Sequence, residues 1–406
     1  MTKKILVTGG AGYIGSHTVH LLGKFGYDVV VYDNLSIGSV SAVTNGELVV
    51  GSLENKKLLA RTFVKHKIDA VIHFAASVST PESAVKPLDY YANNTRNTLN
   101  LLQCCQAYRV NKFIFSSTAA VYGEATENPV TETAPTEPIS PYGRSKLMSE
   151  QMIQDYSSSS GLRYVILRCF NAAGADTSGK IGQSAKKTEH LIKVACDTAL
   201  GLRSSLNIFG TNFPTPDGTG IRDYIHVEEL ARAHVDALRY LDADGENQIF
   251  NCGCGQGYSV REVVDKVKEI SGVDFPVLET ARRSGDPACT IACTDKIEGF
   301  LGWKTQLNID AIVKTAFKWE QKLVGFAELE EKLAKQNFKL GVLLLEKQII
   351  SRTDLEKVLE EQAATGKKLG ELLVQKGLLG QKNLDSFLRE QNWRKKGVWL
   401  KVPLAV

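Results

Sequence analysis

The 406-residue sequence has no paired cysteine motif, no long apolar run and little excess of charge of either sign. Its eight cysteines form no C-x-x-C pair and no zinc-like grouping, so we expect no metal site and interpret them as small buried residues in a reducing cytoplasm. The longest early apolar run is short and interrupted by glycine, which argues against a signal peptide or a membrane span. The net charge of +4 is too small for a general nucleic-acid binder. We therefore expect a cytoplasmic protein.

Length and charge distribution indicate several parts. A chain of 406 residues is too long for one small core. Residues 324–406 hold 15 Lys/Arg and 11 Asp/Glu, which leaves 34 of each sign for residues 1–323. The body is therefore neutral and the C-terminal segment carries the whole excess, a balance compatible with a small anionic ligand.

A glycine-rich loop follows the first apolar run. Ile5-Leu6-Val7 leads into Gly9-Gly-Ala-Gly12-Tyr-Ile-Gly15 and then a helical pattern over 16–25. Gly9, Gly12 and Gly15 permit a tight turn whose N–H groups reach a pyrophosphate at the helix N-terminus. A second strand over 28–32 ends in Asp33, which suits the adenosine ribose hydroxyls and repels a 2′-phosphate. The pattern predicts a dinucleotide site and favours NAD over NADP.

Further apolar segments alternate with helical ones. We expect strands ending near residue 53 and covering 69–74, 112–116 and 164–169, with one long helix over 87–108. This alternation predicts a parallel sheet covered on both faces. Ligands then bind at the carboxyl ends of the strands, where Gly9, Asp33, Ala75 and Thr118 fall. Ser52 would face the adenine, and Ala75-Ala76 would let a cofactor lie against the backbone.

Tyr142 and Lys146 are four residues apart at an expected helix start, so both side chains lie on one face. A tyrosine base at neutral pH needs a pKa drop of about three units, roughly 4 kcal/mol. One cation at ~4 Å in a partly shielded site supplies about that much. Lys146 is a candidate for that cation, with an oxidised nicotinamide as a second one, and Thr118 is placed to hydrogen-bond the same substrate hydroxyl. The three residues predict proton transfer in alcohol–ketone chemistry.

Residues 1–322 resemble the extended short-chain dehydrogenase/reductase family, within it the nucleotide-sugar 4-epimerases. The resemblance rests on segments 8–15, 32–36, 74–76, 116–123, 140–143 with Lys146, 170–171 and 218–227. It implies a Rossmann-like doubly wound parallel sheet over 1–170, interleaved with a smaller α/β substrate domain over 171–322. It also implies a homodimer, on resemblance alone.

The resemblance assigns ligand contacts to this chain by position. Beyond the glycines, Ser52 and Ala76 named above, NAD contacts are implied at Tyr13, Ile14, Asp33, Asn34, Leu53, Phe74, Ala75, Asn93, Ser116, Tyr142, Lys146 and Phe170. In addition to Thr118 and Tyr142, UDP-sugar contacts are implied at Asn171, His190, Leu191, Asn207, Phe209, Arg222, Arg283 and Asp286. Planar guanidinium donors suit a nucleotide diphosphate, although Arg222 beside Asp223 is also compatible with a surface ion pair.

The implied activity is interconversion of UDP-glucose and UDP-galactose through a 4-keto sugar, with NAD regenerated in each cycle. In the related dehydratases and decarboxylases an acid follows the active-site Thr or Ser, whereas Thr118 is followed by Ala119-Ala120, which favours epimerisation over elimination. Ser52 replaces an acid found in many relatives. Cys289 and Thr290 are small where some relatives carry Tyr, so another UDP-sugar, such as a UDP-N-acetylhexosamine or UDP-pentose, stays open.

The C-terminal segment contains a repeat. Residues 339–362 and 368–391 are 24-residue units offset by 29, with ten identical positions. Each unit predicts two short amphipathic helices, joined in the second unit by a turn at Gly377, and two units can cover each other's apolar faces. We expect a charged, helical linker over 323–337, a small all-α domain over 338–392 and a basic tail over 393–406.

This segment resembles the MshEN-type domain of bacterial secretion and pilus ATPases, a family that binds cyclic di-GMP through two such motifs. The implied ligand residues are Lys339, Leu340, Gly341, Gln362, Lys368, Leu369, Gly370 and Gln391. Lys339 and Lys368 replace a family Arg, which loses the forked donor that suits a guanine edge, and Gln348 replaces a glycine. A protein-interaction or dimerisation module that uses the leucine stripes is the alternative.

Overall fold

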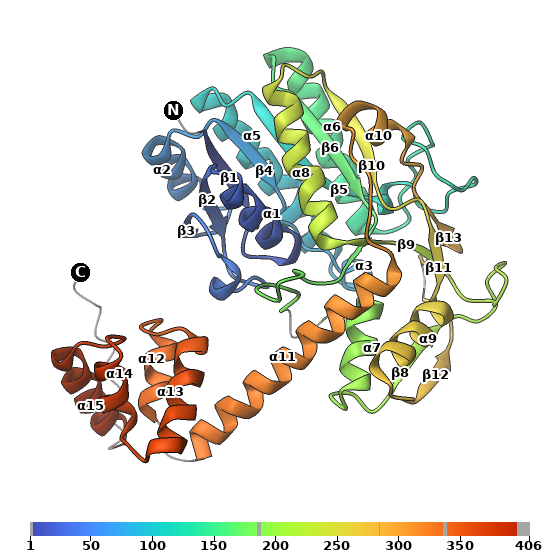
Figure 1. The fold of residues 1–406 in the computed structure, drawn as a ribbon. Helices are drawn as coiled ribbons and strands as arrows, with labels where there is room; N and C mark the ends of the chain where they lie inside the picture. The colour runs from blue at the N-terminus through green and yellow to red at the C-terminus, as the bar shows by residue number, and fades with distance from the viewer. Residues whose placement is uncertain (1–2, 185–187, 284, 336–338, 396–406) are drawn as a thin grey trace. The chain divides into compact units, whose positions relative to one another are not determined.

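The computed structural model describes residues 3–184, 188–283, 285–335 and 339–395 (Figure 1). The chain divides into two compact units, Met1–Glu320 and Gln321–Val406. We call them the catalytic unit and the C-terminal unit, and describe each by itself.

A seven-stranded parallel sheet forms the centre of the catalytic unit, in the order β10-β6-β5-β4-β1-β2-β3. Its strands are β1 (Lys4–Thr8), β2 (Asp28–Asp33), β3 (Glu47–Val50), β4 (Ala70–His73), β5 (Lys112–Thr118), β6 (Arg163–Cys169) and β10 (Gln248–Cys252). The chain reverses its direction of winding between β1 and β4, and in doubly wound sheets ligands bind at such a point. The expected parallel Rossmann-like sheet is confirmed.

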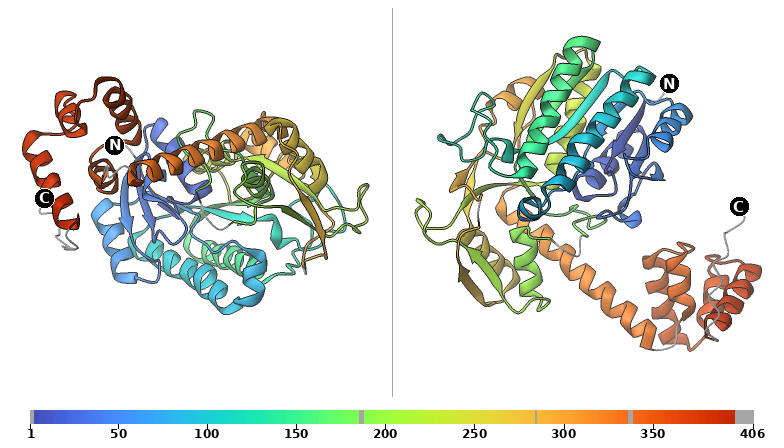
Figure 2. Two further views of the ribbon diagram at one scale, coloured as in Figure 1. Left: turned by 90° about the horizontal axis from the view of Figure 1, so that it is seen from below. Right: turned by 180° about the vertical axis from the view of Figure 1, so that it is seen from behind.

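Helices cover both faces of this sheet, as the views in Figure 2 show. One face carries α1 (Tyr13–Lys24), α8 (Val227–Asp242) and α10 (Asp295–Leu301), and the other carries α2 (Lys56–His66), α5 (Asn97–Tyr108) and α6 (Pro141–Ser160). Two separate apolar cores result, one on each side of the strands. Burial on both faces explains why the strands are almost continuously apolar.

The long helical segment expected over 87–108 is confirmed, but its middle is not α-helical. The segment consists of α4 (Pro87–Tyr90), a π-helical stretch η2 (Tyr91–Arg96) and α5, and it follows the short helix α3 (Thr80–Val85). Asn94 lies in η2 and is buried. Its amide accepts from Ser77 N at 2.8 Å and donates to Ser77 O and Ser145 Oγ at 3.0 Å each. The widened turn, a type often seen at functional sites, lets this side chain reach α6.

Two strand ends also differ from expectation. The third strand ends at Val50 rather than near residue 53, and Ser52 lies in the following turn. The fifth strand runs two residues further, to Thr118, because Ser117 and Thr118 still pair with Arg168 and Cys169 of β6. The extension places Thr118 at the carboxyl edge of the sheet, directly before the 3₁₀ turn η3 (Ala119–Val121). A second 3₁₀ turn, η1 (Val40–Ala42), follows β2.

A smaller α/β part of the catalytic unit is built mostly from residues after 170. Its strands are β7 (Asn171–Ala173), β9 (Ile221–His226), β11 (Gly257–Ser259) and β13 (Cys289–Thr290) in one sheet, with β8 (Leu206–Phe209) and β12 (Val277–Thr280) in a second. The helices α7 (Leu191–Ala199) and α9 (Val260–Ser271) pack on it around a third apolar core. Because β10 returns to the main sheet, the two parts interleave in sequence.

The helix α11 (Ile309–Lys335) begins among buried residues of the catalytic unit, where Ile312 and Val313 are covered. Residues 323–335, which we expected to be a charged helical linker, are helical and form the last turns of α11, and residues 336–337 lie outside the described residues.

The C-terminal unit contains α12 (Lys339–Glu346), α13 (Arg352–Thr365), α14 (Leu369–Gln375) and α15 (Gln381–Lys395). The repeat is visible in main-chain bonds, since Ile349 N bonds Leu344 O at 2.9 Å and Leu378 N bonds Leu373 O at 3.0 Å, 29 residues later. Its apolar core draws leucines from both repeats. Of the expected basic tail, residues 396–406 lie outside the described residues.

Candidate active site

The glycine loop after β1 forms a cradle that no side chain could share. Gly9 has φ +72°, and a Cβ on it would lie 2.6 Å from Ala75 N. A Cβ on Gly15 would lie 2.2 Å from Gly9 O. Gly12 caps α1, and no side chain bonds to that helix start. The loop therefore presents main-chain N–H groups at a helix N-terminus, which fits a pyrophosphate.

Asp33 lies at the carboxyl end of β2, beside that loop, and is buried. Its carboxylate accepts Ala11 N at 3.0 Å and Leu35 N at 2.8 Å. A carboxylate has about four acceptor positions, so two stay for ribose hydroxyl donors. Ser52 Oγ accepts Glu54 N at 3.2 Å. The glycine cradle and Asp33 together fit an NAD molecule.

The other residues expected at the cofactor line the same carboxyl edge. Phe74 follows β4, and the centroid of its ring lies 4.5 Å from the ring centroid of His234 on α8. Ser116 lies on β5 and approaches Cys169 Sγ at 3.5 Å. The remaining expected contacts are Tyr13 and Ile14 in the first turn of α1, Asn34 after β2, Leu53 before α2, Ala75 and Ala76 after β4, Asn93 in η2 and Phe170 after β6. Apart from Ser116 on β5 and Asn93 in η2, these positions belong to loops or helix starts that follow strands of one sheet.

The helix that carries Tyr142 and Lys146 starts where the sequence predicts. Ser140 is its N-cap and accepts Gly143 N at 3.1 Å, with Pro141 at the first helical position. Gly143 lets the helix approach η3 closely, since a Cβ there would lie 2.5 Å from Ala120 O. Tyr142 and Lys146 therefore share the face of α6 that approaches Thr118.

Burial shifts the pKa values of both side chains on this face. Burial raises the pKa of Tyr142 to about 12, although a hydrogen bond with Thr118 acts in the lowering direction. Burial also lowers the pKa of Lys146 to about 8, and its ammonium lies 4.0 Å from the ring centroid of Phe115. Burial therefore acts against ionisation of Tyr142, and its role as a base stays a prediction that depends on Lys146 and an oxidised nicotinamide together. Ionisation needs a further positive charge.

The residues expected to bind the UDP-sugar come from the smaller part and lie on several elements. Asn171 opens β7 and pairs with Tyr224 of β9, while Arg222 lies on β9 itself. Arg283 stacks over Phe209 at 3.6 Å, so these two residues lie together. Asn207 lies on β8, His190 caps α7, Leu191 is the first residue of α7, and Asp286 follows in the loop before β13.

The alternative of an ion pair between Arg222 and Asp223 is not what the structure has. Asp223 is fully buried, and its carboxylate accepts main-chain N–H groups of Cys254, Gly255 and Ala292 at 2.8, 2.9 and 3.1 Å. Arg222 instead donates to the carbonyl of Ile221 at 2.8 Å. Asp223 therefore holds the main chain of the loops at 254–255 and 292 in place. Most of the N–H donors of the Arg222 guanidinium are left for another partner.

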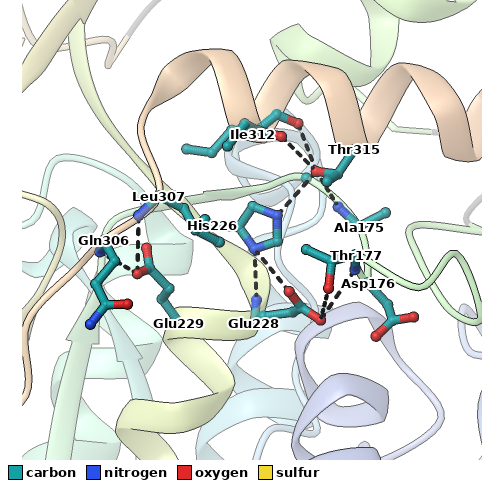
Figure 3. Close-up of polar contacts among 12 residues, drawn as sticks. Ala175, Asp176, Thr177, His226, Glu228, Glu229, Gln306, Leu307, Ile312 and Thr315 are labelled. Carbon is teal, nitrogen blue, oxygen red and sulfur yellow. Dashed lines mark hydrogen bonds and ion pairs between the residues drawn. The ribbon is translucent and has the colours of Figure 1, made fainter.

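Sequence reasoning missed a cluster around His226, shown in Figure 3. Its Nδ1 accepts Glu228 N at 3.2 Å, so Nε2 carries the proton and donates to Thr315 Oγ1 at 3.0 Å. Thr315 Oγ1 also accepts Ala175 N at 3.2 Å, and Glu228 accepts Thr177 N at 3.2 Å. These bonds hold residues 175–177 against α8 and α11. Residues 175–177 follow β7, whose first residue is Asn171. Only the fold brings these distant residues together, so no local signal indicated them.

A second cluster lies behind the catalytic helix. Glu150, four residues beyond Lys146 on α6, is fully buried and pairs with Arg168 at 2.9 Å. The spacing of Tyr142, Lys146 and Glu150 was visible in the sequence, but the partner on β6 was not.

The expected ligand residues of the C-terminal unit fall into three groups. Leu340, Gly341, Leu369 and Gly370 are buried in its own core. Gln362 Nε2 donates to Lys367 O at 3.0 Å, which places it beside the exposed Lys368. Lys339 and Gln391 lie in α12 and α15, and their side chains lie outside the described residues.

Two features are absent from the described residues. No group of three or more His, Cys, Asp or Glu side chains there is arranged to hold a metal ion. No helix in that part of the chain combines the length and apolarity that crossing a bilayer requires. All eight cysteines are free thiols, five of them buried and three partly buried.

Comparison with known proteins gives consistent matches. Residues 5–253 match the NAD dependent epimerase/dehydratase family. A UDP-glucose 4-epimerase of Azospirillum brasilense is 52% identical over 324 residues, covering 79% of this chain and 93% of the relative. The UDP-glucose 4-epimerase of Brucella ovis, solved with NAD, has a TM-score of 0.76 at 45% identity and covers 78% of this chain and 98% of its own. The UDP-Glc/GlcNAc 4-epimerase of Campylobacter jejuni has a TM-score of 0.69 at 45% identity and covers 79% and 99%.

Proposed function

Because the chain belongs to the NAD dependent epimerase/dehydratase family, we propose that it interconverts UDP-glucose and UDP-galactose by oxidation and re-reduction at C4 of the sugar. It is an NAD-dependent isomerase. The observation that carries the proposal is the placement of Thr118, Tyr142 and Lys146 at the edge of the sheet that also holds the glycine cradle.

We assign the catalytic roles with the support of the contacts of these side chains. The Tyr142 oxygen takes the proton of the 4-hydroxyl while the C4 hydrogen leaves as a hydride, which yields a 4-keto sugar. Thr118 bonds both Tyr142 and Ala120 N, and so directs the phenol toward the sugar. Return of the hydride to the opposite face of C4, with the proton given back by Tyr142, completes the inversion.

When bound, NAD supplies the hydride acceptor and a positive charge. Bringing the phenol from a pKa of about 12 to about 7 requires roughly 7 kcal/mol of stabilisation of the phenolate. Lys146 provides part of it from the same helix face. A closed, partly dry site strengthens each charge interaction. The proposal therefore needs both the ammonium and the bound cofactor.

We assign the UDP-sugar to the residues of the smaller part, listed above by element. Arg283 stacked on Phe209 and the free fork of Arg222 suit the diphosphate and uracil of such a ligand. The division into a cofactor part over 1–170 and a sugar part over 171–322 is our proposal as well.

We also propose that the protein is located in the cytoplasm. The eight free thiols agree with a reducing cytoplasm as its location.

Elimination of water is the competing reaction. In the dehydratases that the chain resembles an acid follows the active-site Thr or Ser, whereas η3 has Ala119 and Ala120 there. We therefore favour epimerisation.

A second open point is the identity of the sugar, since Cys289 on β13 is small and the Campylobacter jejuni relative is named for Glc/GlcNAc.

The test incubates the purified enzyme with UDP-glucose, UDP-galactose, two UDP-N-acetylhexosamines and a UDP-pentose in D₂O. We expect the C4 epimer of UDP-glucose, at unchanged mass, with no deuterium at C4 because the hydride returns within the pocket. A product lighter by one water indicates elimination, and turnover of an N-acetylated or pentose substrate alone moves the assignment to that sugar. No turnover of any substrate contradicts the proposal.

We propose a homodimer, supported by the resemblance and by apolar side chains exposed on neighbouring helices, Leu99 on α5 and Met148 on α6. Light scattering after size exclusion should give twice the chain mass of 44.5 kDa. A monomer at micromolar concentration removes the assignment.

For the C-terminal unit we propose cyclic di-GMP binding, with an effect on turnover. The support is the tandem motif and the position of Gln362 beside Lys368. Calorimetry of the full chain with cyclic di-GMP should give binding that Lys368→Ala weakens and that an exposed control, Lys357→Ala, leaves unchanged. A flat titration at high concentration removes this part of the proposal and leaves the interaction-module alternative.

A further inference from the structure

Glu150 is a buried charge on the catalytic face of α6. It lies four residues beyond Lys146 and eight beyond Tyr142, so the three side chains form one stripe along the helix. Its exposure is 0%. A fully buried carboxylate is expensive unless it is paired and hydrogen-bonded.

The partners of Glu150 come from two adjacent strands. Ser117 of β5 donates its hydroxyl to Glu150 Oε1. Arg168 of β6 donates from Nη2 to Oε2 at 2.9 Å and from Nε to both oxygens at 3.3 Å. Ser117 and Arg168 face each other directly in the strand register. Glu150 therefore fastens α6 to both strands, next to Thr118.

Arg168 is itself held from the other side. Its Nη1 donates to Tyr122 Oη at 3.0 Å and to Glu132 O at 3.3 Å. Tyr122 in turn donates to Asn251 Oδ1 of β10 at 2.6 Å. The guanidinium has little freedom to follow a displaced helix, so the position of α6 is set by the sheet.

Glu150 also contributes its negative charge. Replacing a buried ion pair by apolar residues often costs no stability, so stability alone does not explain its presence. Burial lowers the pKa of Lys146 to about 8, whereas Cys169 and, to a smaller extent, the Glu150 carboxylate act in the opposite direction. Without this carboxylate the ammonium would lose its proton at lower pH.

The other titratable groups around Lys146 carry no full negative charge in the working range. They are Tyr142 on the same helix, Cys169 on β6, His73 on β4 and His234 on α8. Burial raises the pKa of Tyr142 to about 12 and that of Cys169 to about 11, so both are neutral in the chain alone. Burial lowers the pKa of both histidines, so they are neutral as well. The four side chains Tyr142, Cys169, His73 and His234 are therefore neutral, and Glu150 supplies the anion near Lys146.

Resting on the proposed function, we propose that Glu150 is a positioning residue of the epimerase reaction: it fixes α6 on β5 and β6 so that Tyr142 and Lys146 meet Thr118, and it places a carboxylate about one helical turn from the Lys146 ammonium.

Glu150→Gln tests the charge, because it keeps the size and one acceptor oxygen. We expect kcat to fall at least tenfold, the alkaline limb of the kcat–pH profile to move down by about one pH unit, and KM for the UDP-sugar to stay within twofold. Glu150→Asp restores the charge and should return the limb to its wild-type position. Asp242→Asn removes a carboxylate from the remote pair with Lys112, and should leave the limb unmoved.

A second readout needs no turnover. Because the folded pKa of Lys146 lies below the unfolded value, the unfolded chain holds more protons between the two, and the free energy of unfolding rises with pH across that window. In Glu150→Gln the lower edge of the window should move to lower pH, measured by urea unfolding at pH 6–11. This result stands even if no UDP-sugar is turned over, so it separates a failure of the inference from a failure of the proposed function.

Two outcomes overturn the inference. One is a Glu150→Gln protein with wild-type kcat and an unmoved alkaline limb. If Glu150→Gln does not fold, Ser117→Ala replaces it, because this change leaves the charge and removes only the strand contact. We expect a several-fold lower kcat with an unmoved limb, and a wild-type kcat in Ser117→Ala is the second overturning outcome.

Discussion

The catalytic unit buries charged and polar side chains throughout, among them Glu150, Arg168, Asp223 and Lys146. In the described part of the C-terminal unit every buried residue is apolar or glycine. The sequence follows the same division, since all seven histidines, eight cysteines and thirteen tyrosines precede residue 321. Burial of polar groups is costly and needs a functional or structural use, whereas leucine burial follows directly from packing. The comparison separates a part built for chemistry from a part built on a packing repeat.

Acid should separate the two units most strongly. His17, His226 and His234 are buried, and burial lowers the pKa of each to about 4. Between the unfolded value near 6.5 and about 4 the unfolded chain binds more protons, so the free energy of unfolding falls as the pH falls. Each ring contributes about 3 kcal/mol across this window. The C-terminal unit has no histidine and should not respond in this way.

Denaturant unfolding at pH 7, 5.5 and 4.5, followed by near-ultraviolet dichroism of the tyrosines of the catalytic unit and by amide exchange in the C-terminal unit, measures both responses. Equal loss of stability in both units would break the comparison.

A cavity in the apolar core of the C-terminal unit should lower the stability of that unit and leave turnover unchanged. Leu373 is fully buried among leucines of both repeats, so Leu373→Ala should cost about 2–5 kcal/mol of stability in the C-terminal unit. We expect kcat without added cyclic di-GMP to stay within twofold. Ile153→Ala makes a comparable cavity under α6 and should lower both stability and kcat. A loss of turnover in Leu373→Ala would contradict the separation of roles.

Lys146→Met should separate activity from stability within the catalytic unit. Turnover should fall by about 10²-fold or more, since the cation that stabilises the phenolate is gone. The fold should gain on the order of 1–3 kcal/mol near pH 7, because burial disfavours this ammonium. Lys357→Met, at an exposed position of the C-terminal unit, should change neither quantity. Steady-state kinetics and urea titration check both signs, and a destabilised but active Lys146→Met would be the opposite of this expectation.

The smallest effect concerns the repeat. Gln348 has φ +57° at the position where the second repeat has Gly377 with φ +70°. A left-handed backbone costs a side-chain-bearing residue about 1 kcal/mol that glycine does not pay. Gln348→Gly should therefore stabilise the C-terminal unit by about 1 kcal/mol, less the added chain entropy of glycine. Gly377→Gln should destabilise it, and a gain in Gly377→Gln would argue against equivalent turns.

Sequence patterns predicted the parts of the molecule that depend on short spacings. The glycine loop, Asp33 at a strand end, the start of α6 before Tyr142 and the repeat offset of 29 all appear at the expected places. The misses depend on partners far along the chain. The π-helical stretch follows from the bonds of Asn94 to Ser77 and Ser145. The raised pKa of Tyr142 follows from burial, which no local pattern reports.

The same limit explains the clusters found only in the structure. His226 and Thr315 are 89 residues apart in sequence and meet because β9 and α11 pack together. Glu150 and Arg168 meet through the contact of α6 with β6. Residue types alone indicated neither pair.

Turnover of UDP-glucose by Tyr142→Phe tests the central claim most directly, with Tyr156→Phe on the same helix as the control. The account predicts that Tyr142→Phe folds, keeps its NAD and loses about 10²- to 10⁴-fold in kcat, while Tyr156→Phe turns over like the wild type. A Tyr142→Phe enzyme that epimerises UDP-glucose at the wild-type rate would contradict the account.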